Sequence, residues 1–176
     1  MKLFSANIED LRSLYIDNLQ KALDMEQNIT KALPRMIEHS SDADLANAFR
    51  THLEETRGHV SKVQRLLDKA TGEASTTKCK VIGSLITEAE DTIKDVKVPT
   101  VLDVALIGAA QQVEHHEIAV YGTLRNWAEL LSLGDHVPVL EAILEEEKNA
   151  DKTLTELSDT LNTIAEPVGS SSSTRY

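Results

Sequence analysis

The chain has 176 residues, enough for one domain with a sizeable core, and it contains few glycines, prolines and aromatic residues. This composition excludes an all-β sandwich or barrel, which needs many turns and β-branched or aromatic strands, and it predicts an all-α protein. The formal net charge of −11 repels phosphate backbones, so no nucleic-acid partner is expected.

The sequence also lacks the signals of a membrane or secreted protein. No apolar stretch reaches the roughly 18 residues that a membrane span needs. The opening segment MKLFSANIEDLR contains acidic residues by position 9 and no apolar secretory core. The single cysteine, Cys79, cannot form an intramolecular disulfide. We therefore expect a soluble cytoplasmic protein without a membrane partner.

The periodicity of apolar residues predicts two long helices in the first part of the chain. The first covers about residues 7–36, with Asn7 as its N-cap and with Pro34 kinking its last turn. The second covers residues 41–71 and stops at a Thr-Gly pair. A loop at residues 72–77 follows.

Three further helices are predicted in the second part. A shorter one at about residues 78–94 precedes a break at Pro99. A fourth helix runs over residues 100–131, with Asp103 in a capping position, and a Ser-Leu-Gly-Asp turn leads to a fifth helix over residues 138–165.

These elements predict a four-helix bundle formed by one domain. Two tight turns pair the long helices into two antiparallel hairpins, and the short helix lies in the crossover between them. The domain covers residues 1–166, and the tail at residues 167–176 is predicted to be disordered.

Each long helix carries acidic residues on the stripe that should face the interior, where apolar residues are expected. Counting residues from the turns places Glu26 and Glu55 at the same depth, facing each other, and all four sets can converge near the middle of the bundle. The candidate metal ligands are, in chain order, Glu26, Glu55, His59, Glu114, Glu117, Glu147 and Asp151.

Each of these signals has an ordinary explanation when it is taken alone. A single glutamate on a helix stripe usually keeps its carboxylate in water, and a Glu–His pair four residues apart is usually exposed. His52 either supports a site from behind or lies on the surface, and two of the three acids at residues 145–147 should face solvent. Tyr121 either donates a hydrogen bond to a ligand or is a core residue.

The coincidence across four helices favours a dinuclear metal site. Several buried acids without compensation would repel one another and be forced to take up protons. Two divalent metal ions would remove that conflict. Carboxylates with one or two imidazoles suit iron or manganese, whereas zinc sites favour cysteine and histidine.

The chain also resembles the ferritin-like family of YciE and YciF over about residues 5–165. The resemblance rests on LDMEQNITKALPRM (23–36), AFRTHLEETRGHV (48–60), KCKVIGSLITEAED (78–91), AAQQVEHHEIAVYGTLRNWA (109–128) and LEEEKNADKTLTEL (144–157). It implies a ferritin-like bundle related to rubrerythrin, a homodimer, a di-iron centre and a link to bacterial stress responses.

The match to the rubrerythrin-type ligand pattern is incomplete. Asp151 stands where that pattern often has a histidine, and the chain has no Cys-x-x-Cys pair for an electron relay. We expect two iron ions, or manganese, with Glu55 and Glu147 as the bridging pair. Such a centre would react with a small oxidant, oxygen or peroxide, and the sequence leaves open whether the protein is an enzyme.

Two other functions are compatible with the sequence. One is a non-catalytic stress protein that acts through its dimer or a partner, with its acids hydrated or with a purely structural metal. The other is a cage that stores iron or protects DNA, although the chain has no basic tail for DNA and no signal for shell assembly.

Overall fold

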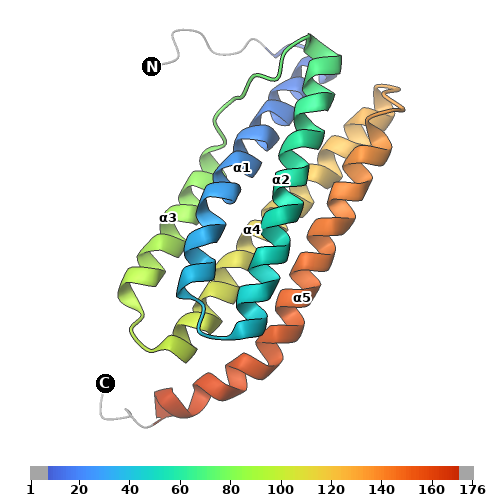
Figure 1. Cartoon of the computed structure of the whole chain (residues 1–176). Coiled ribbons are helices and arrows are strands. Elements are labelled where there is room, and N and C mark those ends of the chain that lie inside the picture. Colours follow the sequence, from blue (N-terminus) through green and yellow to red (C-terminus); the bar gives the residue numbers. More distant parts are fainter. Residues whose placement is uncertain (1–7, 171–176) are drawn as a thin grey trace.

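The computed structural model describes residues 8–170, with side chains for residues 8–166. This part of the chain forms five helices and no strand: α1 (Leu11–His39), α2 (Ala43–Thr71), α3 (Lys80–Asp95), α4 (Pro99–Leu130) and α5 (Val137–Ser170). The pairs α1–α2 and α4–α5 form two long hairpins, and α3 packs against α1 and α4 (Figure 1). The predicted all-α bundle with a short crossover helix is confirmed.

The ends of the bundle differ from the prediction in two places. Asp10 is the N-cap of α1, where its carboxylate accepts a hydrogen bond from the Ser13 N–H at 2.7 Å, and Asn7 lies outside the described residues. The last helix continues to Ser170, past the predicted end at residue 165, and residues 171–176 lie outside the described part.

Asp103 has a different role from the predicted one. The fourth helix begins earlier, at Pro99, so Asp103 is not part of its cap. It is buried instead, and its carboxylate accepts hydrogen bonds from the backbone N–H groups of Ser41 at 2.8 Å and Asp42 at 3.1 Å. The turn between α1 and α2 is thereby tied to α4, which fixes how the two hairpins meet at this end.

A second buried contact joins the hairpins at the other end. The Tyr15 hydroxyl of α1 and Nδ1 of His136, just before α5, form a 2.8 Å hydrogen bond. In the α4–α5 turn, the residue with a left-handed backbone is Ser132 (φ 57°) and not the glycine that follows. Gly72 (φ 82°) ends α2 as predicted.

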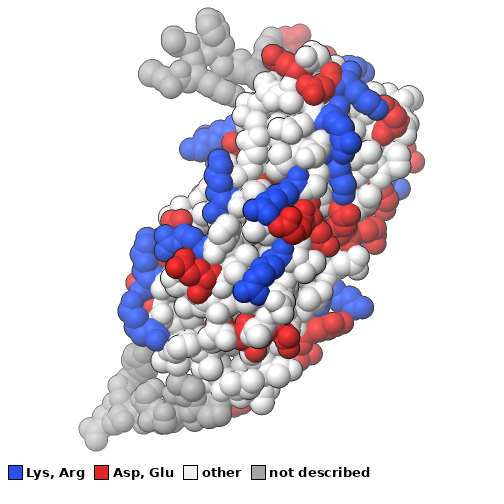
Figure 2. Space-filling model, in the orientation of Figure 1, with Lys and Arg blue, Asp and Glu red and all other residues white. Residues whose placement is uncertain are grey.

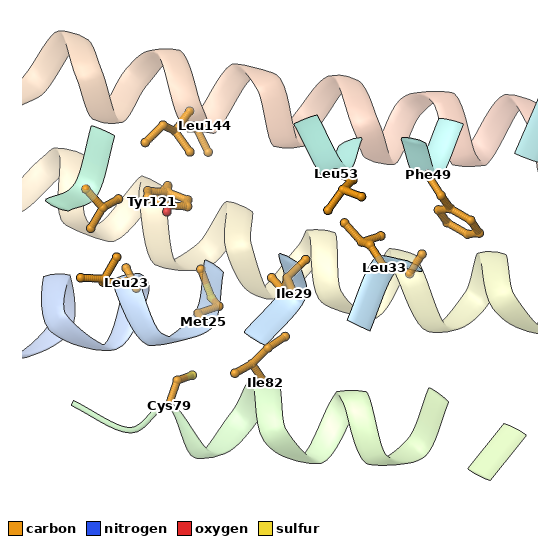
Figure 3. Close-up of a cluster of buried hydrophobic side chains, with 14 of the residues drawn as sticks. Leu23, Met25, Ile29, Leu33, Phe49, Leu53, Cys79, Ile82, Tyr121 and Leu144 are labelled. Carbon is orange, nitrogen blue, oxygen red and sulfur yellow. The ribbon is translucent and has the colours of Figure 1, made fainter. Parts of the chain in front are cut away.

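The core between the helices is largely apolar. In the cluster drawn in Figure 3, Leu33 of α1 and Leu53 of α2 point toward each other, whereas Leu23 of α1 lies at the other end of the cluster, with Tyr121 of α4. In the described part of the chain, none of the helices combines the length and the hydropathy that crossing a bilayer requires. Near mid-length, the apolar core is interrupted by buried acidic and imidazole side chains.

Candidate metal centre

Six buried ionisable side chains from α1, α2, α4 and α5 lie together inside the bundle. None is more than 6% exposed: Glu26, His52, His59, Glu114, Glu117 and Glu147. Their ligand atoms form two groups, and within each group all the atoms lie within 4.8 Å of one another. The four-residue group is His52, Glu114, Glu117 and Glu147, and the three-residue group is Glu26, His59 and Glu147. Glu147 belongs to both groups.

The three-residue group is centred on one nitrogen of His59. Its Nδ1 lies 2.9 Å from Oε1 of Glu147 and 3.6 Å from Oε2 of Glu26. The other oxygen of Glu26 accepts a hydrogen bond from the buried hydroxyl of Tyr121. Tyr121 therefore does what the sequence suggested as one of its two roles, holding a carboxylate of the cluster.

A further carboxylate orients the ring of His59 from outside the group. Nε2 of His59 lies 2.6 Å from Oε2 of Glu146, which also accepts a hydrogen bond from Lys62 at 2.7 Å. Burial raises the pKa of Glu146, but Lys62 and His59 outweigh it and lower that pKa. Because the ionised Glu146 engages the Nε2 proton, Nδ1 is the nitrogen that faces the cluster, and it offers its lone pair there once the ring has lost its second proton.

The four-residue group is centred on His52. Its Nε2 lies 3.4 Å from Oε1 of Glu114 and 4.0 Å from Oε2 of Glu117, and its Nδ1 lies 3.9 Å from Oε2 of Glu147. Neither ring nitrogen has a hydrogen-bond partner, and neither oxygen of Glu117 has one. This group is held by charge and packing alone.

Burial and the charges of the protein itself favour proton binding by the cluster. Burial raises the pKa of Glu114 to about 8 although His52 lowers it, and burial also raises the pKa values of Glu26 and Glu117. Burial lowers the pKa of both imidazoles, but the surrounding carboxylates raise the pKa of His52 to about 9 and that of His59 to about 10. Raised pKa values of buried acids and of the imidazoles beside them are the response to crowded negative charge in a buried site.

Unpaired polar atoms test whether the cluster fits a metal ion. Within residues 8–166, most buried side-chain oxygens and nitrogens without a hydrogen-bond partner belong to these six residues. Each such atom costs about 1–3 kcal/mol, so their concentration at one place indicates a ligand beyond the chain itself. The donors are carboxylate oxygens and imidazole nitrogens without a thiolate, a set that hard to borderline metal ions prefer. The cluster can therefore hold a metal ion.

Five of the seven ligands predicted from the sequence lie in these groups, and two do not. The side chain of Glu55 is 37% exposed, with Oε2 3.8 Å from Nδ1 of His52. Asp151 is 22% exposed and lies 3.3 Å from Nε2 of the exposed His115. The residue of α2 that faces Glu26 is His59 and not Glu55.

Sequence reasoning missed the roles of two residues. The sequence does not decide whether His52 supports a site or lies on the surface. It predicts that two of the three acids at residues 145–147 face solvent, without distinguishing Glu146 from its neighbours. The buried stripe of α2 runs through His52, Thr56 and His59, at steps of four and three residues. That spacing was available in the sequence and would have selected His52 over Glu55, which lies about 100° away from Thr56 around the helix.

The fold is shared with ferritin-like bundles. A solved structure described as ferritin-like, diiron-carboxylate proteins from Bacillus anthracis superimposes with a TM-score of 0.67, over 86% of this chain and 99% of that one, at 18% identity. At this identity the likeness concerns the fold alone.

A family model described as a domain of unknown function, DUF892, matches residues 10–166, and the chain belongs to this family. Protein YciF of Escherichia coli K12 is 36% identical over 152 residues, which make up 86% of this chain and 92% of that protein. The resemblance to YciF noted in the sequence is confirmed.

Two solved structures share more of the sequence. The E. coli stress protein YciF matches with a TM-score of 0.85 at 34% identity, over 89% of this chain and 99% of that one. YcfI from Rhodopseudomonas palustris, whose description proposes a structural role, matches with a TM-score of 0.84 at 40% identity, over 87% and 98%.

Proposed function

We propose that the cluster binds two iron or manganese ions, one in each group, with Glu147 bridging them. The observation that carries this proposal is the position of the Glu147 carboxylate. Its Oε1 lies toward His59 of the three-residue group, its Oε2 lies toward His52 of the four-residue group, and neither oxygen has a hydrogen-bond partner. Glu147 thus keeps the bridging role expected from the sequence, whereas His52 replaces Glu55 among the ligands.

The proposed chemistry is the reduction of oxygen or peroxide. A reduced pair of ions supplies two electrons when bound, which together with two protons convert one hydrogen peroxide into two waters. The chain holds the ligands in place for this: Tyr121 fixes Glu26, and Glu146 fixes His59. The similar E. coli YciF is described as a stress protein. Together with the proposed consumption of peroxide, this supports a role for the chain in oxidative stress. The homodimer stays a prediction.

The test is metal analysis of protein from iron- and manganese-supplemented cells, combined with anomalous scattering at both absorption edges. We expect about two ions per chain, on the ligands named above. Glu147→Ala should lower both the metal content and peroxide consumption, whereas Glu145→Ala, on the 55% exposed neighbour, should change neither. A bundle that stays empty after anaerobic loading with Fe²⁺ would contradict the proposal.

A non-catalytic role is the second candidate, and the description of YcfI favours it. The version with hydrated acids is excluded because Glu26 and Glu117 have no exposed surface. The remaining version has a metal that only stabilises the bundle. Protein that binds about two ions but consumes no peroxide above the Glu147→Ala background would support this version.

A further inference from the structure

The buried cluster adjoins two cavities that lie between different helices, and both reach it at the four-residue group. The α2–α5 cavity, of about 150 Å³, lies between those two helices, and the α3-side cavity, of about 40 Å³, lies between α1, α3 and α4. His52 and Glu114 line both cavities. Neither lining includes Glu26 or His59, so the four-residue group is the part of the cluster that a ligand from outside meets first.

The two linings differ in chemistry. The α3-side cavity is lined largely by aliphatic side chains such as Ile29, Leu33 and Val113. The α2–α5 cavity adds oxygen-bearing side chains to its apolar ones, from Thr51, Glu55, Asn149 and Thr153. A divalent cation that loses hydration water needs oxygen ligands along its path, and the α2–α5 cavity has a series of them. The α3-side cavity has one carboxylate besides the shared Glu114, that of Glu90, and its lining includes the cationic Arg35.

Glu55 occupies the position between solvent and the buried ligands. Its side chain is 37% exposed, and its Oε2 lies 3.8 Å from Nδ1 of His52, which has no hydrogen-bond partner. It is outside both ligand groups. On the face drawn in Figure 2, acidic side chains lie along the middle of α5 among lysine and arginine side chains. Glu146 pairs with Lys62 and Glu145 pairs with Lys148. Glu55 is therefore the exposed carboxylate of the cavity lining that remains for an entering cation.

We infer that the α2–α5 cavity is the path by which divalent cations reach the cluster, and that Glu55 receives the ion at its mouth and passes it to His52 and Glu114. This inference rests on the proposed metal binding but concerns the rate of loading and not the final occupancy. The partial exposure of Glu55 fits this role, because a receiving carboxylate must contact both water and the site.

The experiment measures anaerobic uptake of Co²⁺ by the metal-free full chain, followed in a stopped-flow instrument by the visible absorption of bound Co²⁺. Glu55→Gln should slow uptake about tenfold while the final number of ions stays unchanged. Glu54→Gln is the matched control, since Glu54 is the neighbouring residue, is 69% exposed and pairs with Arg57 instead of the cluster. It should load at the wild-type rate.

A second pair of variants changes the volume of a cavity and leaves the charge of its lining unchanged. Ala150→Leu narrows the α2–α5 cavity and should slow uptake, whereas Ala109→Leu narrows the α3-side cavity and should leave it unchanged. Circular dichroism of each variant checks that the bundle is folded.

The outcomes separate this inference from the proposed function. Wild-type uptake rates in both Glu55→Gln and Ala150→Leu would overturn the inference that the α2–α5 cavity is the path of entry. A lower final number of ions in Glu55→Gln would also overturn it, because Glu55 would then be a ligand. Wild-type protein that binds neither Co²⁺ nor Fe²⁺ would refute the metal centre itself.

Discussion

The two halves of the cluster share Glu147 but are supported differently. In the three-residue group, Glu26 is held by Tyr121 and His59 is held by Glu146, which is itself held by Lys62. In the four-residue group, the ring of His52 has no hydrogen-bond partner. The first half is enclosed by protein, whereas the second adjoins both cavities.

This difference separates a preorganised site from an accessible one. Ligands that are already oriented by outer hydrogen bonds bind a metal ion with little rearrangement, so the three-residue group should hold its ion tightly. The four-residue group must adjust its side chains on binding and should exchange its ion faster. A centre of this design keeps one ion resident while the other half receives ions and small molecules.

The largest effect is expected from removing either histidine. His59→Ala and His52→Ala each remove the only nitrogen donor of one group, so bound metal should fall from about two ions per chain to about one. The ion that remains differs: in His52→Ala it lies in the enclosed half and should resist a chelator, whereas in His59→Ala it should be lost quickly. Metal analysis during incubation with EDTA measures this, and equal rates of loss would contradict the comparison.

The next effect concerns the pH dependence of the metal-free protein. The pKa values of Glu114 (about 8), His52 (about 9) and His59 (about 10) are all raised above those of the unfolded chain. Groups of this kind stabilise the fold below their unfolded pKa, and that stabilisation is lost as the pH rises through the folded pKa. The free energy of unfolding should therefore fall by several kcal/mol between pH 5.5 and 9.

Urea unfolding at several pH values checks this dependence. Metal loading should remove or reverse the slope, because the ions bind the deprotonated ligands and gain affinity as the pH rises. Metal-free protein whose stability increases with pH over this range would show that the cluster does not retain its protons.

The sequence predicts the helices and their arrangement better than it predicts the ligands of the site. The five helices and the inward position of Glu26, Glu114 and Glu117 follow from periodicity, which depends only on neighbours along the helix. The position of each side chain along the axis of the bundle was harder to predict. Side chains lean toward the N-terminus of their helix, so in an antiparallel pair the partner of Glu26 on α2 lies further from the turn, at His59 and not at Glu55.

A local sequence pattern does not predict contacts between segments that lie far apart in the sequence. Asp103 matched a helix-capping position, but it accepts hydrogen bonds from residues about 60 positions earlier. Glu146 matched a solvated position, yet it contacts His59 across the interface between α2 and α5. In both cases the partner is set by how the hairpins dock, and docking is determined by the packing of the whole core.

A smaller effect is expected at the carboxylate behind His59. Glu146→Gln preserves the shape but weakens the charge-assisted contact that orients the imidazole, so metal affinity of the three-residue group should fall by about 10–100-fold. Glu145→Gln is the matched control, because Glu145 pairs with Lys148 on the same helix. Isothermal titration with Mn²⁺ under anaerobic conditions resolves the two sites. An equal loss in both groups would show that Glu146 acts on the whole bundle and not through His59.

The smallest effect is expected from Tyr121→Phe, which removes only the hydroxyl that donates to Glu26. The ring still fills its place in the core and still lies edge-on to His59, with the ring centroids 6.4 Å apart. Metal affinity of the three-residue group should fall only a few-fold, because a bound ion continues to orient Glu26. In the metal-free protein the same variant should lower the free energy of unfolding by about 1–3 kcal/mol, since one more buried carboxylate oxygen is left without a hydrogen-bond partner. Urea unfolding with and without metal measures both values. A larger loss in the loaded protein than in the metal-free protein would mean that Tyr121 acts on the ion itself and not by holding Glu26.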